Sequence, residues 1–134
     1  MAVPKDYRYT DSHEWVRIEE DNLVTVGITD YAQEKLGDIV SVELPRLGDE
    51  VERGERIGMI DSQKASSEVF APVSGVIAEV NELLNDDPAV INSDPHEEGW
   101  IVRIEVEEIE QIDDLMSADD YEELIGRLDE EDAD

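Results

Sequence analysis

Alternating hydrophobic and polar positions recur along most of the first 107 residues and predict a series of short strands. The segments 14–20 and 23–28 alternate on either side of Asp21 and Asn22, a turn-forming pair, which predicts a hairpin. A further strand is predicted over 100–107, where every second residue is apolar.

The segment 38–44 alternates in the same way and stops at Pro45, so we expect Val40, Val42 and Leu44 to point into the core. Segment 46–61 follows and carries three glycines. It therefore predicts a pair of strands interrupted by tight turns.

Two segments have the features of helices instead. Residues 29–37 predict a helix of about two turns, because Thr29 suits an N-cap and Gly37 suits a C-cap. Residues 117–128 predict an amphipathic C-terminal helix with Ser117 as its N-cap. Its apolar stripe has the spacing i, i+3, i+4, i+7 and consists of Tyr121, Leu124, Ile125 and Leu128.

These elements predict a mostly β fold of two packed antiparallel sheets, with a short early helix and a C-terminal amphipathic helix. Residues 82–99 contain two Asp-Pro pairs and predict a surface loop with one short helical turn. At 134 residues we expect one domain, 1–134, with a core at about 7–107, the helix at about 118–128 and an acidic tail at 129–134.

The charge of the chain is unusual, because 38 acidic against 10 basic residues give a formal net charge of −28. Such a charge destabilises a compact state by self-repulsion, and molar salt shortens the Debye length to about 3 Å and screens it. We therefore predict a halophilic source. Nucleic acid is excluded as a partner because no basic patch exists to neutralise phosphates.

The chain has no cysteine, which excludes disulfides, thiolate nucleophiles and zinc–thiolate sites. Its first ten residues lack the apolar stretch of a signal peptide, and no apolar run is long enough to span a membrane. We expect a cytoplasmic protein, and a monomer with transient partners. His13 and His96 lie far apart without a ligand pattern, so we predict no metal site.

One of only three lysines, Lys64, lies between two strand-like runs, at the position of a hairpin turn. The residues after it, Ala65, Ser66 and Ser67, are small and leave its side chain accessible. Segment 62–80 holds only two acids, whereas 105–134 holds fifteen. A solvated surface charge is the ordinary role of a lysine, but this setting favours a lysine that a modifying enzyme can reach.

The stretch "DSQKASSEVFAPVSGVIAEVN" resembles the lipoyl-lysine hairpin of the glycine cleavage system H proteins. "SHEWV", "VGITDYAQEKLGDIVSVELPRLGD", "VINSDPHEEGW" and "MSADDYEEL" resemble other signatures of that family, in the same order. The resemblance thus covers nearly the whole chain. Biotin carriers have a similar hairpin, but their lysine lies between methionines, and here Gln63 and Ala65 flank it.

The resemblance implies a lipoyl-domain-like barrel-sandwich hybrid and a carrier without catalytic activity, with lipoic acid in amide linkage on Lys64. Such a carrier shuttles an aminomethyl group and reducing equivalents between three enzymes. These are a glycine decarboxylase that uses pyridoxal phosphate, an aminomethyltransferase that uses folate, and a dihydrolipoyl dehydrogenase that uses FAD and NAD. A lipoate ligase or lipoyltransferase would load it. Tethering raises the local concentration of the cargo at each enzyme.

The resemblance also implies roles for further residues. Glu14 and Glu68 are candidates to hold a cationic amine in an arm cleft, with Ser12 and Lys35 beside them. Asp61 stands three residues before Lys64, where a glutamate is usual in the family. The resemblance implies that the attaching enzyme recognises the hairpin through this residue. Gly75, eleven residues after Lys64, would serve the same recognition, and we expect it to set the turn of the second strand.

Two other functions remain open on the sequence. One is a lipoate relay that passes the group to other 2-oxoacid dehydrogenase complexes. The other is an unmodified acidic interaction module that kept the fold and lost the task.

Overall fold

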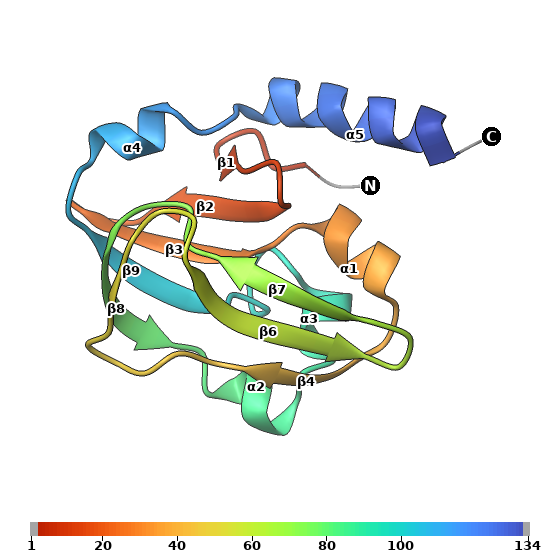
Figure 1. The fold of residues 1–134 in the computed structure, drawn as a ribbon, viewed down its shortest axis with the longest axis horizontal. Helices are drawn as coiled ribbons and strands as arrows, with labels where there is room; N and C mark the ends of the chain where they lie inside the picture. The colour runs from red at the N-terminus through yellow and green to blue at the C-terminus, as the bar shows by residue number, and fades with distance from the viewer. Residues whose placement is uncertain (1–2, 133–134) are drawn as a thin grey trace.

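Two antiparallel β-sheets pack face to face in the computed structural model, which describes residues 3–132 (Figure 1). The larger sheet has the strand order β1-β2-β3-β9-β8-β5, and the smaller has the order β4-β6-β7. This architecture confirms the predicted mostly β fold with short helices and a C-terminal helix.

The strands are β1 (Arg8–Tyr9), β2 (Glu14–Ile18), β3 (Leu23–Ile28), β4 (Ile39–Glu43), β5 (Glu50–Val51), β6 (Arg56–Ser62), β7 (Ser66–Phe70), β8 (Gly75–Val80) and β9 (Val102–Val106). The helices are α1 (Asp30–Leu36), α2 (Leu83–Asp86), α3 (Val90–Ser93), α4 (Glu110–Asp113) and α5 (Ala118–Asp132).

The main apolar core lies between the two sheets. Val16 and Ile104 from the larger sheet and Ile60 from the smaller sheet are all fully buried in it. These residues come from the alternating segments, so the period of two that marks each strand also selects its core face.

Helix α5 lies on the side of the larger sheet where β1 and β2 are found (Figure 1). A second apolar cluster joins β1 and β2 to this helix. Trp15 is fully buried there beside Tyr9 and Tyr121, whose stacked rings have centroids 4.6 Å apart. The first three residues of β2 are therefore buried, on both faces of the strand, and Glu14 at its start lies in the interior of the protein.

Both predicted helix starts are confirmed by their caps. The Thr29 hydroxyl accepts a hydrogen bond from the Ala32 amide at 3.2 Å, and Gly37 closes α1 with a φ of 80°. The Ser117 hydroxyl accepts from the Asp120 amide at 3.2 Å at the start of α5. Helix α5 continues to Asp132, beyond the expected end near 128, because segment 129–132 contains neither glycine nor proline to stop it. The rest of the predicted tail, 133–134, lies outside the described residues.

Strand β4 departs from the predicted alternation at one position. Val40 was expected to point inward, but 51% of its surface is exposed, and its neighbour Ile39 is buried instead. The register with β6 shifts between Ile39 and Ser41, which pair with adjacent residues of β6. The shift is a β-bulge in which Val40 is the extra residue, so its side chain turns outward. Val42 and Leu44 pack against the core as predicted.

The glycines of segment 46–61 divide into two kinds. Gly48 and Gly54 have φ angles of 85° and 89° and form the predicted turns. Gly58, expected in a turn, lies within β6, where a Cβ would come within 2.6 Å of the Glu43 carbonyl oxygen. The predicted loop 82–99 contains two short helices, α2 and α3, rather than a single helical turn.

Candidate functional site

Lys64 lies at the turn that joins β6 to β7, as predicted, and is exposed to solvent. Two backbone hydrogen bonds hold the turn in place. The Ser62 amide donates to the Ala65 carbonyl at 2.8 Å, and the Gln63 amide donates to the Asp38 carbonyl at 3.1 Å. The second bond attaches the hairpin turn to the segment that follows α1.

The aliphatic part of the Lys64 side chain lies over Gly37, at the end of α1. A Cβ placed on Gly37 would be 3.3 Å from Lys64 Cε, closer than almost all such contacts in proteins. Gly37 is thus favoured for its positive φ, whereas a Cβ there would be accommodated by a small shift of the flexible Lys64 side chain.

A cavity of about 370 Å³ lies between the start of β2, helix α1, strand β7 and helix α5. It brings together four residues that the resemblance had singled out in three distant segments: Ser12, Glu14, Lys35 and Glu68. The rest of its lining consists of His13, Ile28, Tyr31, Ala32, Leu36, Ser67 and Leu128. Lys64 is not part of the lining, but its side chain lies over Gly37, next in sequence to Leu36.

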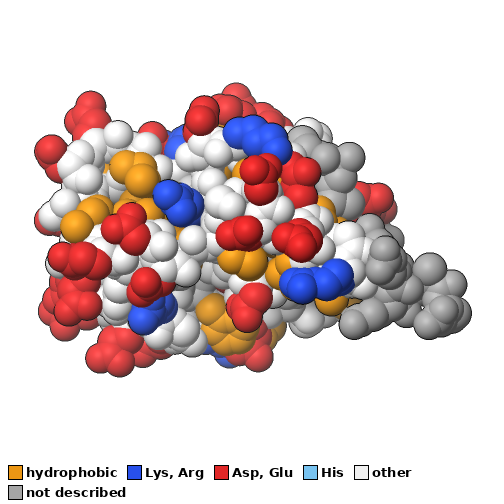
Figure 2. Space-filling view, turned by 90° about the horizontal axis from the view of Figure 1, so that it is seen from above, with side chains coloured by type: hydrophobic (Ala, Val, Ile, Leu, Met, Phe, Trp, Pro, Cys, Tyr) orange, Lys and Arg blue, Asp and Glu red, His pale blue; other side chains and the backbone are white. Residues whose placement is uncertain are grey.

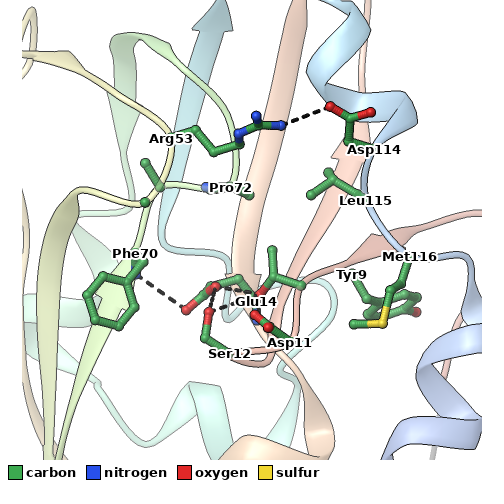
Figure 3. A pocket seen from close by; sticks show the side chains of 13 residues that line it. Tyr9, Asp11, Ser12, Glu14, Arg53, Phe70, Pro72, Asp114, Leu115 and Met116 are labelled. Carbon is green, nitrogen blue, oxygen red and sulfur yellow. Dashed lines mark hydrogen bonds and ion pairs between the residues drawn. The ribbon is translucent and has the colours of Figure 1, made fainter.

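The Glu14 carboxyl group is buried, with 1% of the residue exposed. Its Oε1 accepts hydrogen bonds from the hydroxyls of Thr10 and Ser12, both at 2.6 Å, and its Oε2 accepts from the Phe70 amide at 3.3 Å (Figure 3). Burial raises the pKa of Glu14, and the three hydrogen bonds oppose that rise. Oε2 therefore keeps the greater capacity to accept a further donor.

Thr10 is a site residue that sequence reasoning missed. Its hydroxyl also accepts from the Glu14 amide at 3.1 Å, and its carbonyl accepts from the His13 amide, so residues 10–14 form a compact turn that closes on itself. The only signal in the sequence is the cluster of turn-forming residues Thr10, Asp11 and Ser12 before a strand.

A second cavity of about 390 Å³ lies on another side of Glu14 (Figure 3). Ser12 and Glu14 line both cavities and so form the partition between them. An ion pair between Arg53 and Asp114, at 3.0 Å, crosses this cavity from a turn to the end of α4.

His13 connects the first cavity to helix α5. It has a φ of 72°, an uncommon conformation for a residue with a side chain. Its Nδ1 lies 2.8 Å from the Tyr121 hydroxyl, which is 2.7 Å from the hydroxyl of Thr29. Burial lowers the pKa of His13, which favours the neutral ring. The same network therefore holds α1, α5 and the cavity wall together.

Lys35 and Glu68 are the charged residues among the exposed members of the first cavity, which also include Ser12 and Ser67. The Lys35 ammonium lies 5.3 Å from the centre of the Tyr31 ring, a cation–π distance that keeps it along the wall. Glu68 lies on β7, opposite Met59 of β6.

Asp61 and Gly75 lie outside this cavity. The Asp61 carboxylate accepts hydrogen bonds from Ser41 and Ser66 at the base of the hairpin. Gly75 does not form a turn, as the sequence had suggested, but begins β8. A Cβ there would lie 2.1 Å from the Glu105 carbonyl oxygen, so the glycine allows β9 to approach closely.

His96 lies in a loop, as expected, but is 8% exposed and not a surface residue. Its Nε2 accepts a hydrogen bond from the Asp30 amide at 3.2 Å, and burial lowers the pKa of its ring. Among the side chains that the structure describes, no three His, Asp or Glu residues are grouped so that they could hold a metal ion. Nor does this part of the chain contain a helix long and apolar enough to cross a membrane.

Comparison with known proteins gives consistent results. A model of the glycine cleavage H-protein family matches residues 7–127. A glycine cleavage system H protein of Staphylococcus epidermidis is 52% identical over 126 residues, which cover 94% of this chain and 99% of the relative. One from Coprothermobacter proteolyticus is 49% identical with the same coverage. The crystal structure of the H protein of Mycobacterium marinum superposes with a TM-score of 0.86 at 40% identity, covering 92% of this chain and 99% of that one.

Proposed function

Because the chain belongs to the glycine cleavage H-protein family, a family of non-catalytic carriers, we propose that it carries lipoic acid on Lys64 and acts as a single carrier domain over 1–134. The dithiolane of the lipoyl group would carry the aminomethyl group and the electrons between glycine decarboxylase, aminomethyltransferase and dihydrolipoyl dehydrogenase. The carrier would work in the cytoplasm with these enzymes.

The observation that supports this proposal most is the position of Lys64. A modified lysine must be reached by the enzyme that loads it, and Lys64 is exposed at a hairpin turn with small residues after it. Its side chain also leads over Gly37 toward the end of α1, one wall of the 370 Å³ cavity. An arm on Lys64 that follows this direction would lie at the cavity, and one that turns away would lie in solvent.

The residues present in the cavity fit a cationic amine at the end of an apolar arm. Ile28, Ala32 and Leu36 provide apolar walls, and Glu14 provides a buried carboxylate. Burial makes the charged form of Glu14 costly when it has no cationic partner. An ammonium group near Oε2 would relieve that cost, so the cavity favours an arm that carries an amine over an arm without one.

The side chain of Lys35 would remain along the wall over Tyr31 and border the path of the arm. Ser12 would keep Glu14 Oε1 occupied, which leaves Oε2 for the cargo. Asp61 would position the base of the hairpin for a lipoate ligase or lipoyltransferase through its bonds to Ser41 and Ser66.

We also attribute the charge of −28 to a host with high internal salt. Acidic side chains are spread over the face shown in Figure 2 and do not form one patch, as expected for a general adaptation of the surface.

The first test is the intact mass of the protein from its native host, followed by peptide mapping of residues 56–81. We expect one lipoyl group on Lys64. Lys64→Arg keeps the charge and should abolish both the added mass and support of glycine–CO₂ exchange, while circular dichroism remains that of the native fold. A Lys64→Arg protein that still supports the exchange would exclude Lys64 as the carrier residue.

Lys35→Arg is the matched control, because it changes another lysine of the same region. It should leave the added mass unchanged. A lipoylated protein that fails to support exchange would instead point to a relay of lipoate to other complexes.

A further inference from the structure

The β-bulge in β4 turns an apolar side chain into solvent beside the Lys64 hairpin. Among the side chains that the structure describes, the large exposed hydrophobic residues are Ile18, Val40, Leu47, Leu83 and Ile109. Val40 alone of these belongs to the three-stranded sheet that carries the hairpin. A bulge costs regular pairing, and bulges often re-aim a side chain next to a functional site.

The position of the bulge along β4 places Val40 near the modified lysine. Its neighbours Ile39 and Ser41 pair with Ser62 and Asp61 at the end of β6. Adjacent strands lie about 5 Å apart and rise about 3.3 Å per residue, so Val40 lies within about 10 Å of the hairpin turn. The bond between Gln63 and Asp38 keeps these two segments together.

We propose that Val40 is a contact for the enzyme that attaches the lipoyl group to Lys64, an inference that rests on the proposed function. That enzyme joins Lys64 Nζ to an activated lipoyl carboxyl group, and the activating group and one proton leave. It must therefore bring its own active site to Nζ. A standard interface covers about 800 Å² of each partner, a patch of roughly 16 Å radius, which includes Val40.

The enzymes of the glycine cleavage cycle have a different requirement. They act on the far end of the lipoyl arm, and so need not cover the surface at the base of the hairpin. The attaching enzyme is thus the one partner whose chemistry requires contact around Lys64 itself. Burial of the exposed half of a valine side chain would contribute to that contact without depending on charge, which salt screens.

The test compares Val40→Asp, Val40→Ile and wild-type apoprotein as substrates of the host's lipoate ligase, with lipoate and ATP, at one fixed high salt concentration. Val40→Asp should lower the kcat/KM of attachment by about tenfold or more, because it places an unpaired charge in the interface. Val40→Ile should be modified at the wild-type rate. Leu47→Asp adds the same charge at a side chain that is 63% exposed beyond the other end of β4, and should have little effect.

A second measurement identifies the partner. Wild-type and Val40→Asp proteins are fully lipoylated with excess enzyme and compared in glycine–CO₂ exchange, where we expect equal rates. Attachment to Val40→Asp at the wild-type rate would overturn the inference. An equal loss of the glycine–CO₂ exchange rate in Val40→Asp would overturn the inference too, because it would assign the surface around Val40 to the enzymes of the cycle. Failure to modify wild-type Lys64 would instead refute the proposed function, and the inference with it.

Discussion

At the scale of single residues, Glu14 links stability to binding. Burial of its carboxylate lowers the stability of the fold, and the same carboxylate is available to bind a cationic amine. Its raised pKa means that the folded state binds a proton more tightly than the unfolded state does. The contribution of Glu14 to stability therefore falls as pH rises from the unfolded pKa of 4.5 through the folded value. Ionisation of Glu14 therefore has a cost in stability, as expected of a binding residue.

We predict that Glu14→Gln separates these two effects. The amide oxygen can still accept from Thr10 and Ser12, but the amide nitrogen cannot accept from the Phe70 amide. Removal of the cost of ionising a buried carboxyl group offsets this lost hydrogen bond, so the free energy of unfolding at pH 7 should stay within about 1 kcal/mol of wild type. Loss of the charged partner should shorten the half-life of the amine cargo on the arm by about tenfold, measured by mass spectrometry.

Glu68→Gln is the control for this prediction, because it removes an exposed carboxylate from the same cavity and should have a smaller effect. If the Glu14→Gln protein holds the amine as long as wild type does, Glu14 is not its partner.

His96, which is buried, and His13, which is half-buried, predict a dependence of stability on pH in the opposite direction. Burial lowers the pKa of both His13 and His96 below 6.5, so the unfolded state binds more protons in this range. Their contribution is complete above pH 6.5 and is lost as pH falls through the folded values. Urea unfolding at pH 7.5 and 5.5, at one high salt concentration, should show lower stability at pH 5.5, by about 1 kcal/mol.

The double variant His13→Asn, His96→Gln should lose most of this pH dependence. Asparagine tolerates the positive φ at position 13, so the change does not add backbone strain. A double variant with the same loss between pH 7.5 and 5.5 as wild type would show that other groups cause it.

At the scale of the elements, two glycines have opposite structural roles. Gly75 begins β8 where the backbone of β9 leaves no room for a Cβ. Gly126 lies within α5, and beyond the backbone of its own helix a Cβ there would meet open space. Gly75→Ala should force β8 away from β9 and cost about 3 kcal/mol or more. Gly126→Ala should stabilise α5 by about 0.5–1 kcal/mol.

Thermal unfolding of both variants measures this contrast, and each serves as the control for the other. A Gly75→Ala protein as stable as wild type would mean that the two strands can separate at no cost. It would also remove the explanation for a glycine eleven residues after Lys64.

At the scale of the whole molecule, the net charge of −28 determines how the fold depends on salt. The ion pairs at the surface are exposed, as in the pairing of Lys5 with Asp119, where 66% and 86% of the side chains are accessible. Such exposed ion pairs contribute little to the free energy of unfolding. They cannot offset the repulsion among 38 acids when salt is low.

We predict that transfer from molar salt to about 10 mM salt unfolds the protein, because the Debye length grows from about 3 Å to about 30 Å. Circular dichroism at a series of salt concentrations measures the midpoint. Replacement of the exposed acids Glu107, Glu108 and Glu110 by glutamine should move the midpoint to lower salt. Native secondary structure in dilute buffer would contradict the prediction that charge repulsion unfolds the protein at low salt. An unchanged midpoint in the glutamine variant would contradict it too.

Much of the fold could be predicted because its signals are local. Each of these signals depends on residues a few positions apart. They are the alternation in segments 23–28 and 100–107, the caps at Thr29, Gly37 and Ser117, and the apolar stripe of α5. The turn at Lys64 could also be located, because two strand patterns flank it. These features require only the periods of strands and helices and the preferences of caps.

Other features were decided by tertiary structure, since they depend on which segments meet. The bulge at Val40 arises from the register of β4 against β6, and the need for glycine at position 75 arises from the approach of β9. Neither partner is near in sequence. The period of two therefore predicted the wrong side for Val40. The turn expected at Gly75 came from the conformational freedom of glycine, and the sequence did not show the approach of β9.

The same holds for the site. The sequence by itself determined the strands, the helix caps and an accessible Lys64, because local backbone preferences and the burial of apolar faces specify them. Only the tertiary structure decided that Ser12, Glu14, Lys35 and Glu68 surround one cavity, and that Thr10 holds the carboxylate of Glu14. The burial that raises the pKa of Glu14 is a property of segments folded against each other, and no single segment contains it.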